Sequence, residues 1–190
     1  MAIPTDELQK TNPSAKIELF EIHLVSAIHG SSDIKRFFNG YGDNSFNNLI
    51  FQSQSYTAIP IEANGFKYAA TRTTLPRPTV RISNLDSTIS ALMTQANLAT
   101  PKNDLNSAKF IRKVTLMKYL DNENFEGNTN PYGTPSNTTY DEEIYFIDRK
   151  TVESKMFVEF ELALNLDLQN RKAPKRIITR NDFPSVGTFV

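Results

Sequence analysis

The segment from residue 154 to residue 166 constrains the fold most, because its apolar residues alternate without interruption. Apolar side chains occupy every second position: Met156, Val158, Phe160, Leu162 and Leu164. Glutamates stand between them at positions 159 and 161. Successive side chains of a strand point to opposite faces of a sheet, so this period of two predicts a half-buried strand. Such a strand needs neighbouring strands beside it.

Further segments show strand-like patterns, at residues 17–24, 49–61, 79–85, 110–120 and 142–150. The last of these is joined to the alternating segment by a short polar turn, as in a hairpin. In residues 17–24 the apolar phase shifts by one position, which predicts a bulge near Phe20. Pro60 predicts an edge or bulged strand. We therefore expect a mostly β fold, either an antiparallel sheet or a barrel-like domain.

One helix is expected between residues 86 and 97. Its apolar residues follow the helical spacing i, i+3, i+4 and i+7, at Ile89, Leu92, Met93 and Ala96. Asp86 or Ser87 is available as the N-cap.

The 190 residues suit a single domain with elaborations. We expect an N-terminal arm over residues 1–16, a β-rich domain over residues 17–170 with an inserted loop at 121–143, and a basic C-terminal tail over residues 171–190. A fraction of 39% apolar residues fits a folded domain.

Two segments carry opposite charge, although the chain as a whole is neutral. The loop contains six acidic residues and no basic ones: Asp121, Glu123, Glu126, Asp141, Glu142 and Glu143. Residues 171–180 contain five basic residues and no acidic ones: Arg171, Lys172, Lys175, Arg176 and Arg180. Both segments suit a solvated surface. The basic segment also suits phosphate binding or an acidic partner, although it lacks the interleaved aromatic residues that stack on bases.

The residue types that carry catalysis are scarce. There is no cysteine, which excludes disulfides, thiolate zinc sites and cysteine nucleophiles. The two histidines, His23 and His29, lie in no catalytic or metal-binding spacing, and we interpret both as surface residues. No segment approaches the ~20 apolar residues of a membrane helix. We expect a non-enzymatic protein without a cofactor or metal, made in the cytoplasm and soluble there.

An ordered set of short patterns resembles a known family. A strand with LFEIHL is followed by Tyr56, by Pro60-Ile61 and Gly65-Phe66, and by Arg77-Pro78 with a strand ending in Ser83-Asn84. IRKVTLMKYLD and the late FVEFELALNLDLQNRKAPKRII complete the set. In this order they resemble the phage minor tail protein L family, the tail-tip proteins of lambda-type phages, over roughly residues 17–180.

The resemblance implies a structural role in the virion. It implies a ring, with a trimer favoured, around the tail axis between the distal tail protein ring and the central hub that carries receptor-binding parts. DNA would be only a transient cargo of the channel. Members of the family typically continue into a cysteine-rich module that looks like an iron–sulfur site, and with no cysteine here that cluster is not carried over.

In such a ring, contacts between unlike surfaces would let the acidic loop of one subunit meet the basic segment of the next. Part of the acidic loop could instead line the channel and repel DNA. Two other functions remain open at this point: a tail-associated cell-wall hydrolase, and a carbohydrate-binding β-domain using Tyr132 and Tyr140.

Overall fold

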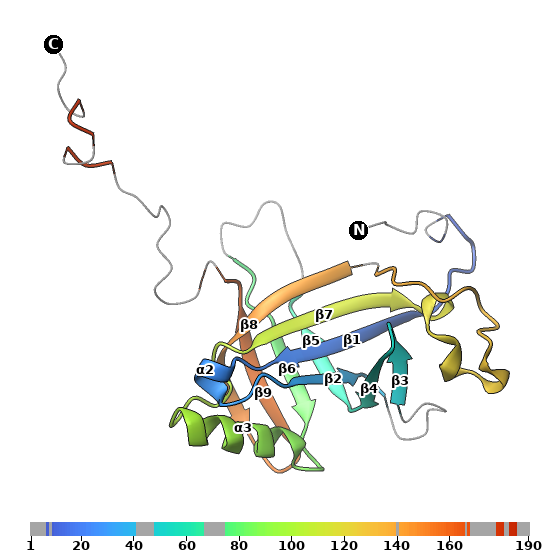
Figure 1. Ribbon diagram of the computed structural model, residues 1–190, viewed down its shortest axis with the longest axis horizontal. Helices are drawn as coiled ribbons and strands as arrows, with labels where there is room; N and C mark the ends of the chain where they lie inside the picture. Colours follow the sequence, from blue (N-terminus) through green and yellow to red (C-terminus); the bar gives the residue numbers. More distant parts are fainter. Residues whose placement is uncertain are drawn as a thin grey trace.

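A computed structural model describes residues 7, 9–40, 48–66, 75–139, 141–165, 167, 178–180 and 183–185. Nine strands form one sheet in the order β3-β4-β2-β1-β7-β8-β9-β6-β5 (Figure 1). Their bounds are β1 Lys16–His23, β2 Ile34–Phe38, β3 Asn48–Phe51, β4 Gln54–Ala58, β5 Ile61–Asn64, β6 Thr79–Ser83, β7 Lys109–Leu116, β8 Asp141–Glu153 and β9 Phe157–Ala163. The helices are α2 (Ser26–His29) and α3 (Thr88–Ala99). Single 3₁₀ turns span Met117–Tyr119, Asn122–Asn124 and Glu126–Asn128.

The expected mostly β fold is confirmed, but the sheet is mixed and does not close into a barrel. Among the described strands, every pair is antiparallel except β2 with β4. The parallel pair arises because the chain leaves β2, forms the edge strand β3, and turns back at Gln52 and Ser53 to insert β4 between them. Both turn residues have positive φ angles, 55° and 58°.

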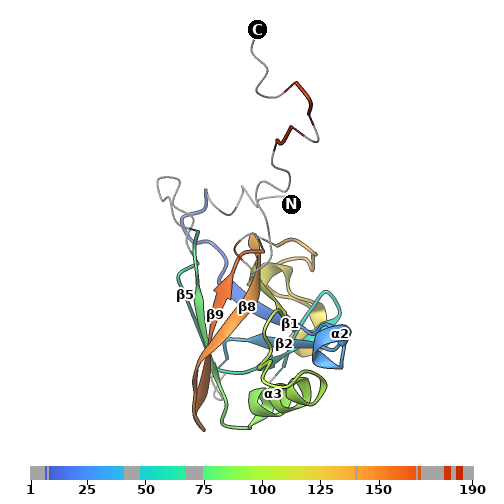
Figure 2. The same ribbon diagram turned by 90° about the vertical axis from the view of Figure 1, so that its left-hand side faces the viewer.

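The long strand β8 divides the sheet into two halves. Its first part, up to Phe146, pairs with β7, and its second part pairs with β9. Two register shifts interrupt the second part, and bulges of this kind bend a strand. As a result β5, β6 and β9 run steeply across the direction of β1 and β7 (Figures 1 and 2).

The space between these halves holds the main core. Residues from most strands pack there with one face of α3, whose four buried side chains are those expected: Ile89, Leu92, Met93 and Ala96. Of the alternating face in β9, Val158, Phe160 and Leu162 are buried, whereas Met156 lies beyond the strand and is 68% exposed. The hairpin and the helix are therefore confirmed, with the apolar face ending sooner than its pattern.

The start of α3 uses a cap that the sequence pattern does not indicate. Ser87 stands at the N-cap position without a side-chain cap hydrogen bond. Instead, Asn84 Oδ1 accepts from the Ser90 backbone N–H at 3.2 Å, and its Nδ2 donates to Ser90 Oγ at 2.8 Å. Asn84 thus holds the helix against the end of β6.

The predicted bulge in β1 is wrong. β1 pairs with β2 and β7 in unbroken register. Its apolar residues change phase because the sheet is covered on both sides there. Phe20 and Ile22 belong to the main core, while Leu19 belongs to a second cluster with Phe38, Leu49, Phe51, Tyr56 and Leu120.

Candidate interaction surface

The loop after β7 is held firmly on the edge strand β3. Asn124 Oδ1 accepts from the Ile50 backbone N–H, and Asn124 Nδ2 donates to the Ile50 carbonyl oxygen, both at 2.6 Å. Asp121 Oδ2 accepts from the Ser53 backbone N–H at 2.7 Å. Asn124 thereby bonds to the backbone at the free edge of β3, as a neighbouring strand would, and Asp121 bonds to the turn that follows. We expected a long exposed loop here; its outer face is exposed, but its inner face is packed.

The loop also satisfies its own backbone. Asn130 Nδ2 donates to the carbonyl oxygens of Met117, Lys118 and Leu120, at 3.2, 3.3 and 3.0 Å. Asn130 is buried, and its own backbone N–H donates to Asn122 Oδ1 at 3.0 Å. The many asparagines of this segment therefore build a defined loop rather than a solvated linker.

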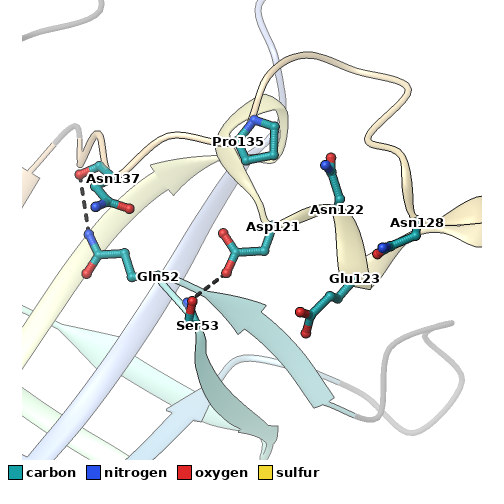
Figure 3. Close-up of a pocket in the computed structure, with 8 residues that line it drawn as sticks. All are labelled: Gln52, Ser53, Asp121, Asn122, Glu123, Asn128, Pro135 and Asn137. Carbon is teal, nitrogen blue, oxygen red and sulfur yellow. Dashed lines mark hydrogen bonds between the residues drawn. The ribbon is translucent and has the colours of Figure 1, made fainter.

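A polar pocket opens where the loop meets the β3–β4 turn (Figure 3). It has a volume of about 370 Å³ and is lined by Gln52, Ser53, Asp121, Asn122, Glu123, Asn128, Pro135 and Asn137. Gln52 Nε2 donates across it to the Asn137 carbonyl oxygen at 3.3 Å. With two carboxylates and four amide side chains around it, the pocket suits a cationic or hydrogen-bonding side chain of a partner.

The structure separates the six acidic residues of the predicted contact. Asp121 is committed to the β3–β4 turn, while Glu123 and Glu126 are exposed on the loop. Asp141, Glu142 and Glu143 belong to β8, and successive residues of a strand face opposite ways. Glu142 is exposed, but Glu143 is buried and accepts from Arg112 at 2.9 Å. Glu123, Glu126 and Glu142 are thus the most accessible of the six.

Of the five basic residues of the predicted contact, the structure describes Arg180. Arg171, Lys172, Lys175 and Arg176 lie outside the described residues. Arg180 is described and exposed. Ile178, two positions earlier, is 66% exposed. The pairing of acidic loop and basic segment therefore stays a prediction.

Of the two tyrosines considered for carbohydrate binding, Tyr132 lies in the described part of the chain and Tyr140 does not. Tyr132 is 59% exposed and its ring packs against Phe125 with centroids 5.8 Å apart. This contact anchors the loop on itself. Tyr140 lies outside the described part of the chain.

A buried carboxylate near the centre of the sheet was not indicated by the sequence patterns. Glu21 in β1 is 4% exposed and accepts hydrogen bonds from Tyr56 Oη at 2.6 Å, His23 Nε2 at 2.7 Å and Lys113 Nζ at 2.8 Å. Burial acts to raise the pKa of Glu21, but the hydrogen bonds from Lys113, Tyr56 and His23 outweigh it and lower the pKa to about 2. Burial, and then the Glu21 carboxylate, raise the pKa of Tyr56. The group ties β4 to β1 across β2.

The surface assignment of His29 is wrong. His29 is fully buried in α2, where the Val25 backbone N–H donates to its Nδ1 at 2.9 Å. Nε2 then carries the hydrogen and donates to the Asn106 carbonyl oxygen at 3.0 Å. Nδ1 therefore bonds to the start of α2 itself, and Nε2 joins α2 to the loop after α3. His23 is partly exposed and bonds to Glu21.

The described residues contain no group of three or more histidine, cysteine, aspartate or glutamate side chains placed to hold a metal ion. None of the helices within the described ranges is long and apolar enough to cross a membrane.

The chain matches a known protein family. The family model described as phage minor tail protein L matches residues 28–186, which is most of the chain. The match begins after β1 and takes in the other eight strands, the polar loop and the segment with the basic residues.

Proposed function

The chain belongs to the phage minor tail protein L family, so it is a structural component of a phage tail, and we propose that it forms a ring at the tail tip. In this proposal the ring surrounds the tail axis between the distal tail protein ring and the central hub that carries receptor-binding parts. A trimer is the favoured assembly.

The family match is the observation that carries this proposal, and the acidic loop supports it. A ring needs contacts between two different surfaces of neighbouring subunits. The loop offers one such surface, because Asn124 and Asp121 fix it on β3 and leave Glu123 and Glu126 exposed. Preformed surfaces lose little conformational entropy on association.

The complementary surface is the basic segment of the neighbouring subunit. Its five basic residues at 171–180 face no acidic residue within the segment. Contacts between exposed charges are weakened by salt, so the ring contact should be strongest at low ionic strength.

Charge reversal in an assembling tail tests this arrangement. Changing Lys172, Lys175 and Arg176 together to glutamate should impair ring formation, measured as incorporation of the chain into purified tails. Reversing Glu123 and Glu126 to lysine in the same chain should restore part of the assembly. Lys102→Glu, at an exposed position after α3, is the control for the change of charge alone.

Two results would count against the proposal. Unchanged assembly of the triple variant at low salt would remove the charge contact. Location of the chain away from the tail tip, by labelling of intact particles, would remove the ring itself.

A further inference from the structure

Within the described part of the chain, no strand pairs with the outer edge of β5, which ends the sheet. Ser83 N–H donates to the Pro60 carbonyl oxygen at 2.9 Å, which marks the paired residues 60 and 83 as a hydrogen-bonded pair. Bonded and non-bonded pairs alternate along an antiparallel ladder, so Ile61 and Ala63 turn their N–H and C=O groups away from β6. Only Ile61 N–H has a described acceptor there, Asn39 Oδ1 at 3.3 Å.

A groove runs along this edge because the curled sheet approaches itself without closing. Ile59 N–H donates to the Phe38 carbonyl oxygen at 3.1 Å, which brings the start of β5 next to the end of β2. The seam groove, as we name it, has a volume of about 590 Å³ and is lined by Glu18, Asn39, Pro60, Ile61, Glu62, Ala63, Arg81, Ser83, Leu85, Met156 and Phe157. Volumes of ~300–1,000 Å³ are typical of ligand sites.

The groove has an apolar end that the single chain leaves open to solvent. Leu85, between β6 and α3, is 72% exposed, and Met156, between β8 and β9, is 68% exposed. Two large apolar side chains side by side around a groove are typical of a surface that another chain covers.

The charges of the groove are mixed but favour a basic ligand. Glu18 and Glu62 line it, with their side chains 41% and 61% exposed, and Glu18 is already paired with Arg112. Arg81 also lines it, but its guanidinium is taken up by Glu159 at 2.8 Å and lies over the Phe157 ring at 4.6 Å. Glu62 accepts a hydrogen bond from Asn64 Nδ2 at 3.0 Å and has a long contact of 3.6 Å with Arg81. Its carboxylate is otherwise open to solvent, so it can accept a further cation.

We propose that the seam groove binds residues 177–180 of a second copy of this chain, which add to β5 as an extra strand. Their sequence, Ile-Ile-Thr-Arg, is rich in β-branched residues, and it places apolar residues before a basic one. The exposed backbone of Ala63 bonds to the added segment. Ile178 packs against Leu85 and Met156, and Arg180 reaches Glu62. The proposal rests on the ring, since it needs copies side by side.

The single chain is consistent with exchange between copies, because Ile178 is 66% exposed within it. Covering an exposed apolar side chain of this size favours association. Residues 171–176 precede the added strand directly, so the basic segment can still meet the acidic loop of the same neighbour.

A peptide tests the groove without an assembled tail. A fluorescently labelled peptide of residues 171–185 is titrated against the full chain, and binding is followed by anisotropy. We expect Leu85→Asp and Met156→Asp each to weaken binding roughly tenfold or more, the scale of one lost apolar contact. Leu98→Asp, at a position that is 84% exposed on α3, is the matched control and should leave binding unchanged. Ile178→Asp in the peptide should weaken binding equally.

Each other outcome overturns the inference. Absence of binding by the peptide rules out the groove as its site. Binding that is lost in Glu123→Lys but kept in Leu85→Asp would place the peptide at the acidic loop instead, which leaves the proposed ring intact. Failure of the ring itself appears separately, in the location of the chain within the tail.

Discussion

The two edges of the sheet differ in how the chain finishes them. At β3, the Asn124 side chain bonds to both backbone groups of Ile50, and Asp121 covers the adjoining turn. At β5, the groups of Ala63 face a groove with exposed apolar walls. Free strand edges promote association unless they are covered or interrupted. Thus β3 is covered within one chain, whereas β5 is the edge that we propose for assembly.

Loose packing of the core beside β5 would leave this edge open without any role in assembly. Ile82 of β6 is paired with Ile61 of β5, and its side chain is fully buried. Ile82→Ala removes most of a packed side chain, so we expect the free energy of unfolding to fall by about 4 kcal/mol. Chemical denaturation measures this value. A loss below about 1 kcal/mol would mean that the core beside β5 is loosely packed.

The buried Glu21 group tests the β3 half. Glu21→Gln leaves Lys113 without its partner, and we expect a loss of about 3 kcal/mol at neutral pH, from the pKa shift between about 4.5 and about 2. Because the folded pKa is lowered, this contribution is present above about pH 4.5 and disappears as the pH falls toward 2.

Stability curves of the wild type and of Glu21→Gln should therefore converge below pH 4.5. The exposed Glu142→Gln is the control, and its curve should follow the wild type throughout. A constant difference between the wild type and Glu21→Gln down to pH 2 would show that the carboxylate charge is not what stabilises β4 on β1.

Much of the fold could be predicted from local patterns. The period of two in β9 and the helical spacing of α3 report which faces are buried, and those faces are buried in the structure. The patterns fail where a strand is covered on both faces. In β1 both faces are covered, so the change of phase reads as a bulge. β2 and α2 were not predicted.

The candidate site was harder to predict, because its parts meet only through the fold. Nothing local shows that Asn124 reaches Ile50, 74 positions earlier in the chain. The burial of His29 is equally hidden, because its partner, the Asn106 carbonyl, comes 77 positions later. The asparagines and glutamates of residues 121–143 did mark this segment as unusual, but charge alone could not separate buried Glu143 from exposed Glu142.

Removing the cover of β3 tests its role directly. Asn124→Ala deletes three hydrogen bonds, two to Ile50 and one to the Asp121 carbonyl. We expect a loss of about 2 kcal/mol, since freed backbone groups at an edge regain water in part. Asn137→Ala, on the exposed part of the same loop, is the matched control. Hydrogen exchange of the Ile50 amide should quicken in the first variant alone; unchanged protection would mean that the loop does not seal this edge.

The open edge should contribute little to the single chain. Leu85→Ala changes a side chain that is 72% exposed, so we expect the free energy of unfolding to stay within about 0.5 kcal/mol of the wild type. The same variant should reduce incorporation into tails. A large loss of stability with normal incorporation would assign Leu85 to the fold rather than to assembly.

The most direct measurement of the central claim is a cryo-EM reconstruction of an intact tail that carries this chain. The account predicts a closed ring of copies at the tail tip, around the tail axis, with each β5 edge covered by its neighbour. Copies spread along the tail tube, or isolated copies with β5 facing solvent, would contradict it.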